Sequence, residues 1–248
     1  MLTTVKGIVI RERTSGETSK FIDVLTENLG VIEISVRGCK KINSKNCAAT
    51  QLFAYSKFCL NKKRDMYYIN CAEPINIFYK LRTDLQKLSL ASYLSELVSY
   101  VIGNEGHEGS ILKLFLNTLH FISNGNRPLE LLKSIFEIRF MSEIGLMPNV
   151  FTCHNCSEYV TESVYFIIND GIISCLDCND SETDSGVKKI SPTVLHTIRH
   201  IILSEYDKLY NFKISEKSQK QLSAVTEQYV ITHLEKDFKT LNFYKSIV

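Results

Sequence analysis

The stretch VKGIVIRERTSGETSKFIDVLTENLGVIEISVR, residues 5–37, contains three apolar runs separated by two polar segments that are rich in turn-forming residues. In the third run apolar and polar positions alternate, and the apolar positions are Ile32, Ile34 and Val36. A period of two is typical of a β-strand that buries one face. The stretch therefore predicts three short strands, over residues 5–13, 20–26 and 31–37.

Two further strand-like runs follow, LFAYSKFCL at residues 52–60 and MYYINCA at residues 66–72. The polar segment NKKRD joins them, and Pro74 is expected to end the second run because proline cannot donate to a sheet ladder. Five strands within about 75 residues favour a small Greek-key barrel of the OB-fold type. The ligand face of such a barrel lies around strands 2 and 3, flanked here by the loops of residues 14–19 and 61–65.

The apolar period changes to three and four residues after residue 80, which predicts α-helices. The expected helices cover residues 81–103, 111–122, 128–144, 193–203 and 215–234. Ser110 is expected to cap the second of these, and Pro128 suits the first turn of the third. The expected fold class is therefore α+β, with an OB-fold barrel in residues 1–80 and a mainly helical domain in residues 81–248.

The segment CHNCSEYVTESVYFIINDGIISCLDC interrupts the helical pattern with two C-x2-C pairs that have eighteen residues between them. The four cysteines are Cys153, Cys156, Cys175 and Cys178. This spacing is typical of a four-cysteine zinc site, and a hairpin turn at residues 169–171 would bring the second pair back to the first. One structural Zn²⁺ per chain is therefore expected, in a zinc ribbon inserted at residues 150–180.

The remaining cysteines stand singly in the sequence and are expected to be small buried or loop residues rather than a disulfide framework. They are Cys39, Cys47, Cys59 and Cys71.

A site closed by four thiolates has no open position for water or substrate, so its expected role is structural. His154 lies between the first two cysteines and could replace one of them as a ligand. His196 and His200 stand four residues apart on one helix face, where they could bind a metal or simply occupy the surface or core. No phosphate-binding loop, nucleophile elbow or HExxH zinc motif occurs in the sequence, and no catalytic residue is expected.

Basic residues are concentrated in the N-terminal part of the chain. Residues 1–80 carry 13 Lys and Arg against 7 Asp and Glu, whereas residues 81–248 carry 16 against 20. Such a distribution is typical of a basic module that meets a polyanion. The basic residues at strand ends and in loops, which are candidate contacts for a polyanion, are Arg11, Arg13, Arg37, Lys40, Lys41, Lys45, Lys62, Lys63 and Arg64.

Aromatic residues are interleaved with these cations, namely Phe53, Tyr55, Phe58, Tyr67 and Tyr68. Cations that neutralise phosphates, together with rings that stack on bases, would make a surface for single strands. Alternatively, the aromatic side chains fill the barrel and the lysines keep its loops in water. Composition alone leaves both interpretations open.

Four segments occur in order along the chain: KGIVIRERTSGETSKFIDVLTENLGVIEISVRGCKK (6–41), AEPINIFYKLRTDLQKLSLASYLSEL (72–97), FEIRFMSEIGLMPNVFTCHNC (136–156) and CLDC (175–178). Together they resemble the RecO family of bacterial DNA repair and recombination mediators. The resemblance covers residues 6–178, and the region after about residue 180 adds less to it.

The resemblance implies an N-terminal OB-fold, a helical C-terminal domain with a zinc site in many members, and no enzymatic activity. It further implies a protein that binds single- and double-stranded DNA, anneals complementary strands, and with RecR helps to load RecA onto DNA covered by the single-stranded DNA-binding protein. The family's basic segment after strand 3 corresponds here to VRGCKK, which favours Arg37, Lys40 and Lys41 as DNA contacts. The acidic C-terminal tail of the single-stranded DNA-binding protein is expected to dock on the helical domain.

The N-terminal sequence lacks the pattern of a signal peptide, and no apolar run is long enough to span a membrane. A cytoplasmic, nucleoid-associated protein without a membrane partner is expected. Two other functions remain open at this point. One is a zinc-ribbon scaffold in transcription or translation whose barrel grips RNA or protein, and the other is a metal hydrolase in which one cysteine is not a ligand.

Overall fold

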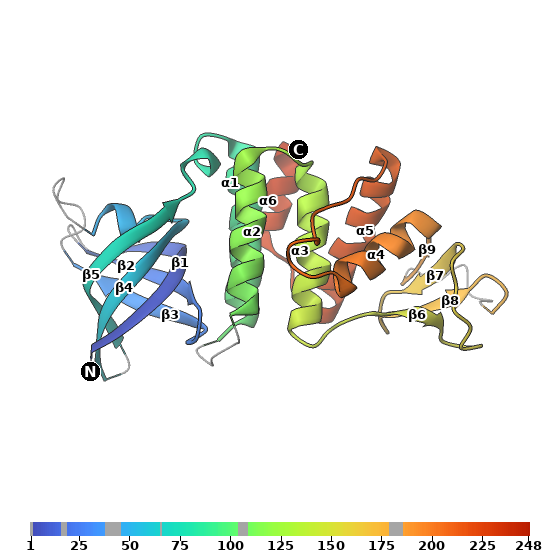
Figure 1. The fold of residues 1–248 in the computed structure, drawn as a ribbon, viewed down its shortest axis with the longest axis horizontal. Coiled ribbons are helices and arrows are strands. Elements are labelled where there is room, and N and C mark those ends of the chain that lie inside the picture. The colour runs from blue at the N-terminus through green and yellow to red at the C-terminus, as the bar shows by residue number, and fades with distance from the viewer. Residues whose placement is uncertain (1, 16–18, 38–45, 65, 104–108, 179–185) are drawn as a thin grey trace. The chain divides into compact units, whose positions relative to one another are not determined.

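The computed structural model describes residues 2–15, 19–37, 46–64, 66–103, 109–178 and 186–248 (Figure 1). The chain forms two compact units, one of residues 1–125 with residues 238–248, and the other of residues 126–237. The division at residue 80, expected from the change of apolar period, stays a prediction.

The first unit begins with five strands that close into a barrel in the order β1-β2-β3-β5-β4. The strands are β1 (Leu2–Ser15), β2 (Ser19–Thr26), β3 (Val31–Val36), β4 (Ala54–Lys63) and β5 (Met66–Ile77). Neighbouring strands are antiparallel except β3 and β5, which are parallel. A closed five-stranded barrel of this size is the predicted OB-fold, so the expected barrel is confirmed.

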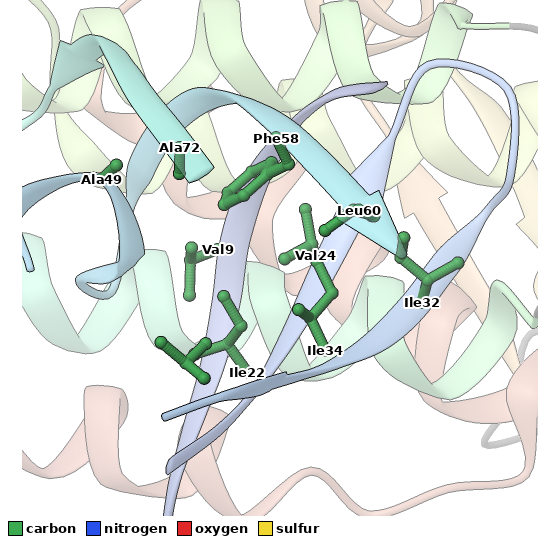
Figure 2. Close-up of a cluster of buried hydrophobic side chains, with 10 residues drawn as sticks. Val9, Ile22, Val24, Ile32, Ile34, Ala49, Phe58, Leu60 and Ala72 are labelled. Atoms are coloured by element: carbon green, nitrogen blue, oxygen red, sulfur yellow. The ribbon is translucent and has the colours of Figure 1, made fainter. Parts of the chain in front are cut away.

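The barrel interior is filled by one apolar cluster, which Figure 2 shows as side chains turned toward one another from different strands. Its members are Val9, Ile22, Val24, Ile32, Ile34, Val36, Ala49, Phe58, Leu60 and Ala72. The alternation in β3 therefore correctly predicted which face of that strand is buried. Phe53 and Phe58 are fully buried, so these two rings belong to the core rather than to a surface that could stack on bases.

Strands β1 and β2 approach so closely at Gly7 that only glycine fits without a shift of the backbone. A Cβ atom at this position would lie 2.6 Å from Val24 Cγ1 and 2.7 Å from the carbonyl oxygen of Leu25. Both distances are far below the usual carbon contact of about 3.5–4.0 Å. A close approach of two strands is one of the few reasons for a glycine within a strand.

Strand β5 continues past Pro74, so the prediction that this proline ends the run is wrong. Pro74 pairs with Ser56 on β4, next to a register shift between Tyr55 and Ser56. A bulge interrupts the ladder locally, and a proline is tolerated there because its missing N–H is not needed for pairing.

Two short 3₁₀ turns, η1 (Ala48–Thr50) and η2 (Tyr79–Leu81), and three helices complete the first unit. The helices are α1 (Leu85–Val101), α2 (Ser110–Asn124) and α6 (Lys239–Ile247). Helix α1 begins later than predicted because the Asp84 carboxylate accepts hydrogen bonds from the backbone N–H groups of Gln86 and Lys87, at 3.0 and 3.2 Å. Gly109, rather than Ser110, occupies the N-cap of α2.

Helix α6 was not predicted from the sequence. It packs on α1, where the hydroxyl and backbone N–H of Thr240 donate to the Glu96 carboxylate, the latter at 3.1 Å. The Phe238 ring also meets the edge of Tyr93, with ring centroids 5.8 Å apart. Helix α6 thus joins the C-terminal end of the chain to the N-terminal unit.

The second unit contains three helices and a four-stranded sheet of order β6-β8-β7-β9. The helices are α3 (Leu129–Glu143), α4 (Pro192–Leu203) and α5 (Glu216–Leu234), and the strands are β6 (Asn149–Cys153), β7 (Val164–Ile167), β8 (Ile172–Cys175) and β9 (Val187–Ile190). Pro128 is the N-cap of α3 rather than part of its first turn. No helix in the described ranges is long and apolar enough to cross a membrane.

A buried ion network joins α3 to α5 in this unit. Lys133 Nζ lies 3.2 Å from Glu137 Oε1 and 3.1 Å from Glu227 Oε2. Although burial disfavours the charged ammonium group, the two carboxylates outweigh it and raise the pKa of Lys133. The Thr226 hydroxyl donates a further hydrogen bond to Glu137.

Candidate metal centre and nucleic-acid interface

The four-cysteine segment folds as predicted around a tight hairpin between β7 and β8. The backbone N–H of Gly171 donates to the carbonyl of Ile167 at 2.9 Å, and Gly171 has a φ of +65°. A left-handed backbone conformation of this kind favours glycine. The turn brings Cys175, at the end of β8, back toward Cys153, at the end of β6, whose neighbour His154 donates its backbone N–H to Ile173 of β8 at 2.8 Å.

The Sγ atoms of Cys153, Cys156, Cys175 and Cys178 all lie within 4.8 Å of one another. The Cys156 and Cys175 sulfurs are 3.9 Å apart. Four sulfurs around a tetrahedral ion with bonds of about 2.3 Å would be separated by roughly 3.8 Å. The donor set and its spacing therefore fit one metal ion of the kind that thiolates bind.

The other candidate ligands are not brought to this site. Among the described residues, the four cysteines form the one cluster of at least three potential ligand side chains, and neither His154, His196 nor His200 belongs to it. His196 is exposed on α4. His200 lies instead against the Phe212 ring, with centroids 5.0 Å apart.

The electrostatics of the sulfurs also favour a cation. Burial alone raises the pKa of a thiol, but backbone N–H groups of Cys156, Cys175 and Asn155 outweigh it and lower the pKa of Cys153 to about 6. Hydrogen bonding to the Cys175 and Cys156 sulfurs instead raises the pKa of Cys178 to about 12. Four thiolates so close together repel one another, so a bound cation is needed for all of them to ionise.

A buried arginine on α4 donates hydrogen bonds to this ribbon. Arg199 Nε donates to the carbonyl of Val150 at 2.7 Å, and its Nη2 donates to that of Phe151 at 2.9 Å. The guanidinium also lies over the Tyr159 ring, 4.5 Å from the centroid. Burial lowers the pKa of Arg199, and these contacts offset the cost of burying its charge.

The predicted DNA contacts are only partly within the described residues. Lys40, Lys41 and Lys45 lie outside them. Arg11 is exposed on β1. The remaining exposed cations lie just beyond β3, at the end of β4 and in the turn that follows β4, and they are Arg37, Lys62, Lys63 and Arg64.

Three of these cations gather around two tyrosines of β5. The Arg37 guanidinium and Lys63 Nζ lie 5.6 and 6.0 Å from the centroid of the Tyr68 ring. Lys62 Nζ lies 5.2 Å from the centre of the Tyr67 ring. The strands create this group, because Tyr68 pairs with Ser35 of β3 on one side and with Asn61 of β4 on the other.

A hollow of about 470 Å³ opens on the outer surface of the barrel at this place. It is lined by Ser35, Arg37, Asn46, Asn61, Lys63, Tyr68, Ile69 and Asn70. Cations, a half-buried aromatic ring and amide side chains together can contact phosphates, stack on a base and hydrogen-bond to it. The sequence did not indicate the asparagines, because only the strand register and the fold of the chain bring them beside Tyr68.

Arg13 is not part of this hollow. Its Nη2 lies 2.8 Å from Asp23 Oδ1 and also contacts the Glu33 carboxylate. Hydrogen bonds to these two carboxylates raise the pKa of Arg13. Its charge is therefore balanced by carboxylates on β2 and β3. No ion pair involving Arg37 or Lys63 is present among the described residues.

Comparisons with known proteins agree with this architecture. The family model described as "Recombination protein O N terminal" matches residues 1–78, and the one described as "Recombination protein O C terminal" matches residues 82–242. A relative from Acetivibrio thermocellus, named DNA repair protein RecO, is 35% identical over 242 residues, which are 97% of this chain and 95% of the relative. A relative of the same name from Alkaliphilus metalliredigens is 31% identical over 248 residues and covers both chains completely. The chain therefore belongs to the RecO family.

Proposed function

We propose that this protein is a non-enzymatic DNA-binding mediator of recombination in DNA repair. The single observation that carries the proposal is the hollow on the barrel surface, where Arg37 and Lys63 flank the half-buried Tyr68 ring in a chain of the RecO family. The names of the relatives give the biological setting, which is DNA repair.

In this proposal the barrel binds both single- and double-stranded DNA. Arg37, Lys63, Lys62 and Arg64 contact phosphates, joined by Arg11 and by Lys40, Lys41 and Lys45 of the segment after β3. Tyr68 stacks on a base of a single strand, which needs no particular sequence. Arg13 makes a smaller contribution because Asp23 and Glu33 already balance its charge.

Annealing follows from the same surface. A basic face reduces the repulsion between two phosphate backbones while the bases remain free to pair. No step requires a nucleophile or ATP. With RecR, the protein would help to load RecA onto DNA covered by the single-stranded DNA-binding protein, whose acidic C-terminal tail would dock on the helical part of the chain. Association with the nucleoid would follow from DNA binding.

The four cysteines hold one structural Zn²⁺ in this proposal. Zinc is the metal that four thiolates with this spacing usually bind, and a four-sulfur site leaves no position open for water. When bound, the ion stabilises the ribbon by supplying the charge that lets all four sulfurs ionise together. This interpretation opposes the hydrolase alternative, which needs one cysteine to stay away from the metal, because all four sulfurs converge here.

The proposal is tested by mixing complementary fluorescent oligonucleotides that are coated with their single-stranded DNA-binding protein. We expect the protein to accelerate annealing without ATP. Folded, metal-loaded protein that leaves the rate unchanged would contradict the mediator function. Tight binding of RNA in the same preparation, without annealing, would favour the scaffold alternative.

A further inference from the structure

Two cysteines outside the four-cysteine group face each other across the barrel sheet. Cys59 of β4 and Cys71 of β5 are direct partners in the antiparallel ladder. Cys59 is half-buried, Cys71 is exposed, and both are free thiols. The sequence predicted small buried or loop residues at both positions, which is wrong, because both lie on strands, where Cys59 is half-buried and Cys71 is exposed.

The position of this pair in the ladder is compatible with a disulfide. Opposed residues of antiparallel strands have Cα atoms about 4.5–5.5 Å apart. A disulfide spans Cα atoms at about 4.4–6.8 Å. The pair lies next to a register shift between Cys59 and Leu60, where Asn70 has no partner on β4 and places its Nδ2 4.0 Å from Cys59 Sγ.

The location of the pair connects it with the barrel surface described above. The next outward-facing pair along the same two strands is Asn61 and Tyr68, both of which line the hollow. Asn70, which approaches the Cys59 sulfur, lines it as well. A covalent bond between β4 and β5 at this point would brace the strands that carry these residues.

We propose that Cys59 and Cys71 are a redox-active thiol pair that forms a reversible cross-strand disulfide on the outer face of the barrel. The oxidant is a small-molecule disulfide. The thiolate of one cysteine attacks it, which breaks the S–S bond of the oxidant, forms a mixed disulfide and releases one small thiolate. The second cysteine loses its proton and attacks the sulfur of the first, which releases the second small thiolate. Two protein thiols are thus oxidised while the small disulfide is reduced to two thiols.

The two thiols differ in their surroundings, since Cys59 is half-buried and Cys71 is exposed. Partial desolvation and the neighbouring Cys59 sulfur raise the pKa of the Cys71 thiol. Either thiolate can make the first attack, after which the other thiol resolves the mixed disulfide. Because the bond is exposed and adjoins a bulge, it is of the kind that is reduced readily, which makes it reversible in a reducing compartment.

The test equilibrates the full-length, metal-loaded protein in buffers with stepped ratios of reduced to oxidised glutathione. Samples are quenched with acid, free thiols are alkylated, and peptides are identified by mass spectrometry. Zinc content is measured in the same samples, so that oxidation of the four-cysteine group is recognised separately.

We expect a peptide that links Cys59 to Cys71 to increase with the oxidised fraction and to disappear on return to reduced glutathione. Cys71→Ser should leave Cys59 as a lasting mixed disulfide with glutathione. Cys47→Ser, which removes another half-buried cysteine of the same unit, should behave like the unaltered protein. The proposal is overturned if Cys59 and Cys71 carry glutathione separately, pair with other cysteines, or remain thiols at every ratio.

Discussion

The barrel and the four-cysteine ribbon carry their candidate functional residues in opposite ways. In the barrel, the side chains that hold the fold point inward, as Ile34 and Phe58 do, whereas the candidate DNA contacts Arg37 and Lys63 are exposed. In the ribbon, the four sulfurs are at once the candidate metal ligands and the residues that bring the two C-x2-C pairs together. Binding should therefore be separable from folding in the barrel and inseparable from it in the ribbon.

The largest effect is expected at the ribbon. Cys175→Ser removes one of four ligands, so the protein should lose its equivalent of zinc and about 4–5 kcal/mol of unfolding free energy in the unit of residues 126–237. Metal content by mass spectrometry and urea unfolding measure the two losses.

The matched control is His154→Ala, which changes a histidine between two of the cysteines that does not belong to the cluster. It should keep the zinc. If Cys175→Ser retained a full equivalent of zinc with unchanged stability, folding and metal binding in the ribbon would be separate after all.

A comparable loss in the barrel requires a change at its inner packing. Gly7→Ala places a Cβ atom against Val24 and the Leu25 carbonyl, and the backbone oxygen cannot move aside. We expect a loss of about 2–3 kcal/mol of unfolding free energy, which is the upper part of the usual range of about 1–3 kcal/mol for overpacking. Thermal unfolding followed by circular dichroism measures it. A variant as stable as the unaltered protein would mean that β1 and β2 lie farther apart at this point.

A surface change should affect binding without affecting the fold. Tyr68→Ala removes the ring from the hollow, and the affinity for single-stranded DNA should fall by about 5- to 150-fold, since a stacked base contributes about 1–3 kcal/mol. Fluorescence anisotropy with a labelled oligothymidine measures the Kd. Tyr68→Phe keeps the ring and should bind like the unaltered protein. Equal affinity of the alanine variant would show that no base stacks on Tyr68.

The smallest effect is a change in salt dependence. Replacing Arg37 and Lys63 together by alanine should reduce the slope of log K against log salt by about 1.4 for single strands, at about 0.7 for each lost phosphate contact. Lys80→Ala, an exposed lysine that does not line the hollow, is the control and should leave the slope unchanged. The same slope in the double variant would place the phosphate contacts elsewhere on the protein.

Local sequence patterns predicted those features of the structure that residues close together in the sequence determine. The period of two in residues 31–37 identified the buried face of β3, and the two C-x2-C pairs identified the cluster, because each knuckle is a short-range structure. Helix α6 was not predicted, because residues distant in the sequence determine it. It is short, its N-cap Phe238 provides no capping side chain, and it is stabilised by packing on the distant α1.

Features that depend on strand register also could not be predicted from the sequence pattern. Tyr68, Asn61 and Ser35 come from three strands and meet only because β3 pairs with β5 and β5 with β4. The same holds for Cys59 opposite Cys71. Arg13 shows the converse, since composition grouped it with the DNA contacts, yet the register places it beside Asp23 and Glu33.

The most direct test of the separation between binding and folding in the barrel is the annealing rate of a variant in which Arg37, Lys63 and Tyr68 are all alanine. The rate is measured with complementary strands coated with single-stranded DNA-binding protein, at matched zinc content and after its melting temperature has been compared with that of the unaltered protein. We predict that the variant melts like the unaltered protein and no longer accelerates annealing. A stable variant that anneals at the full rate would contradict the account and place the DNA surface outside the hollow.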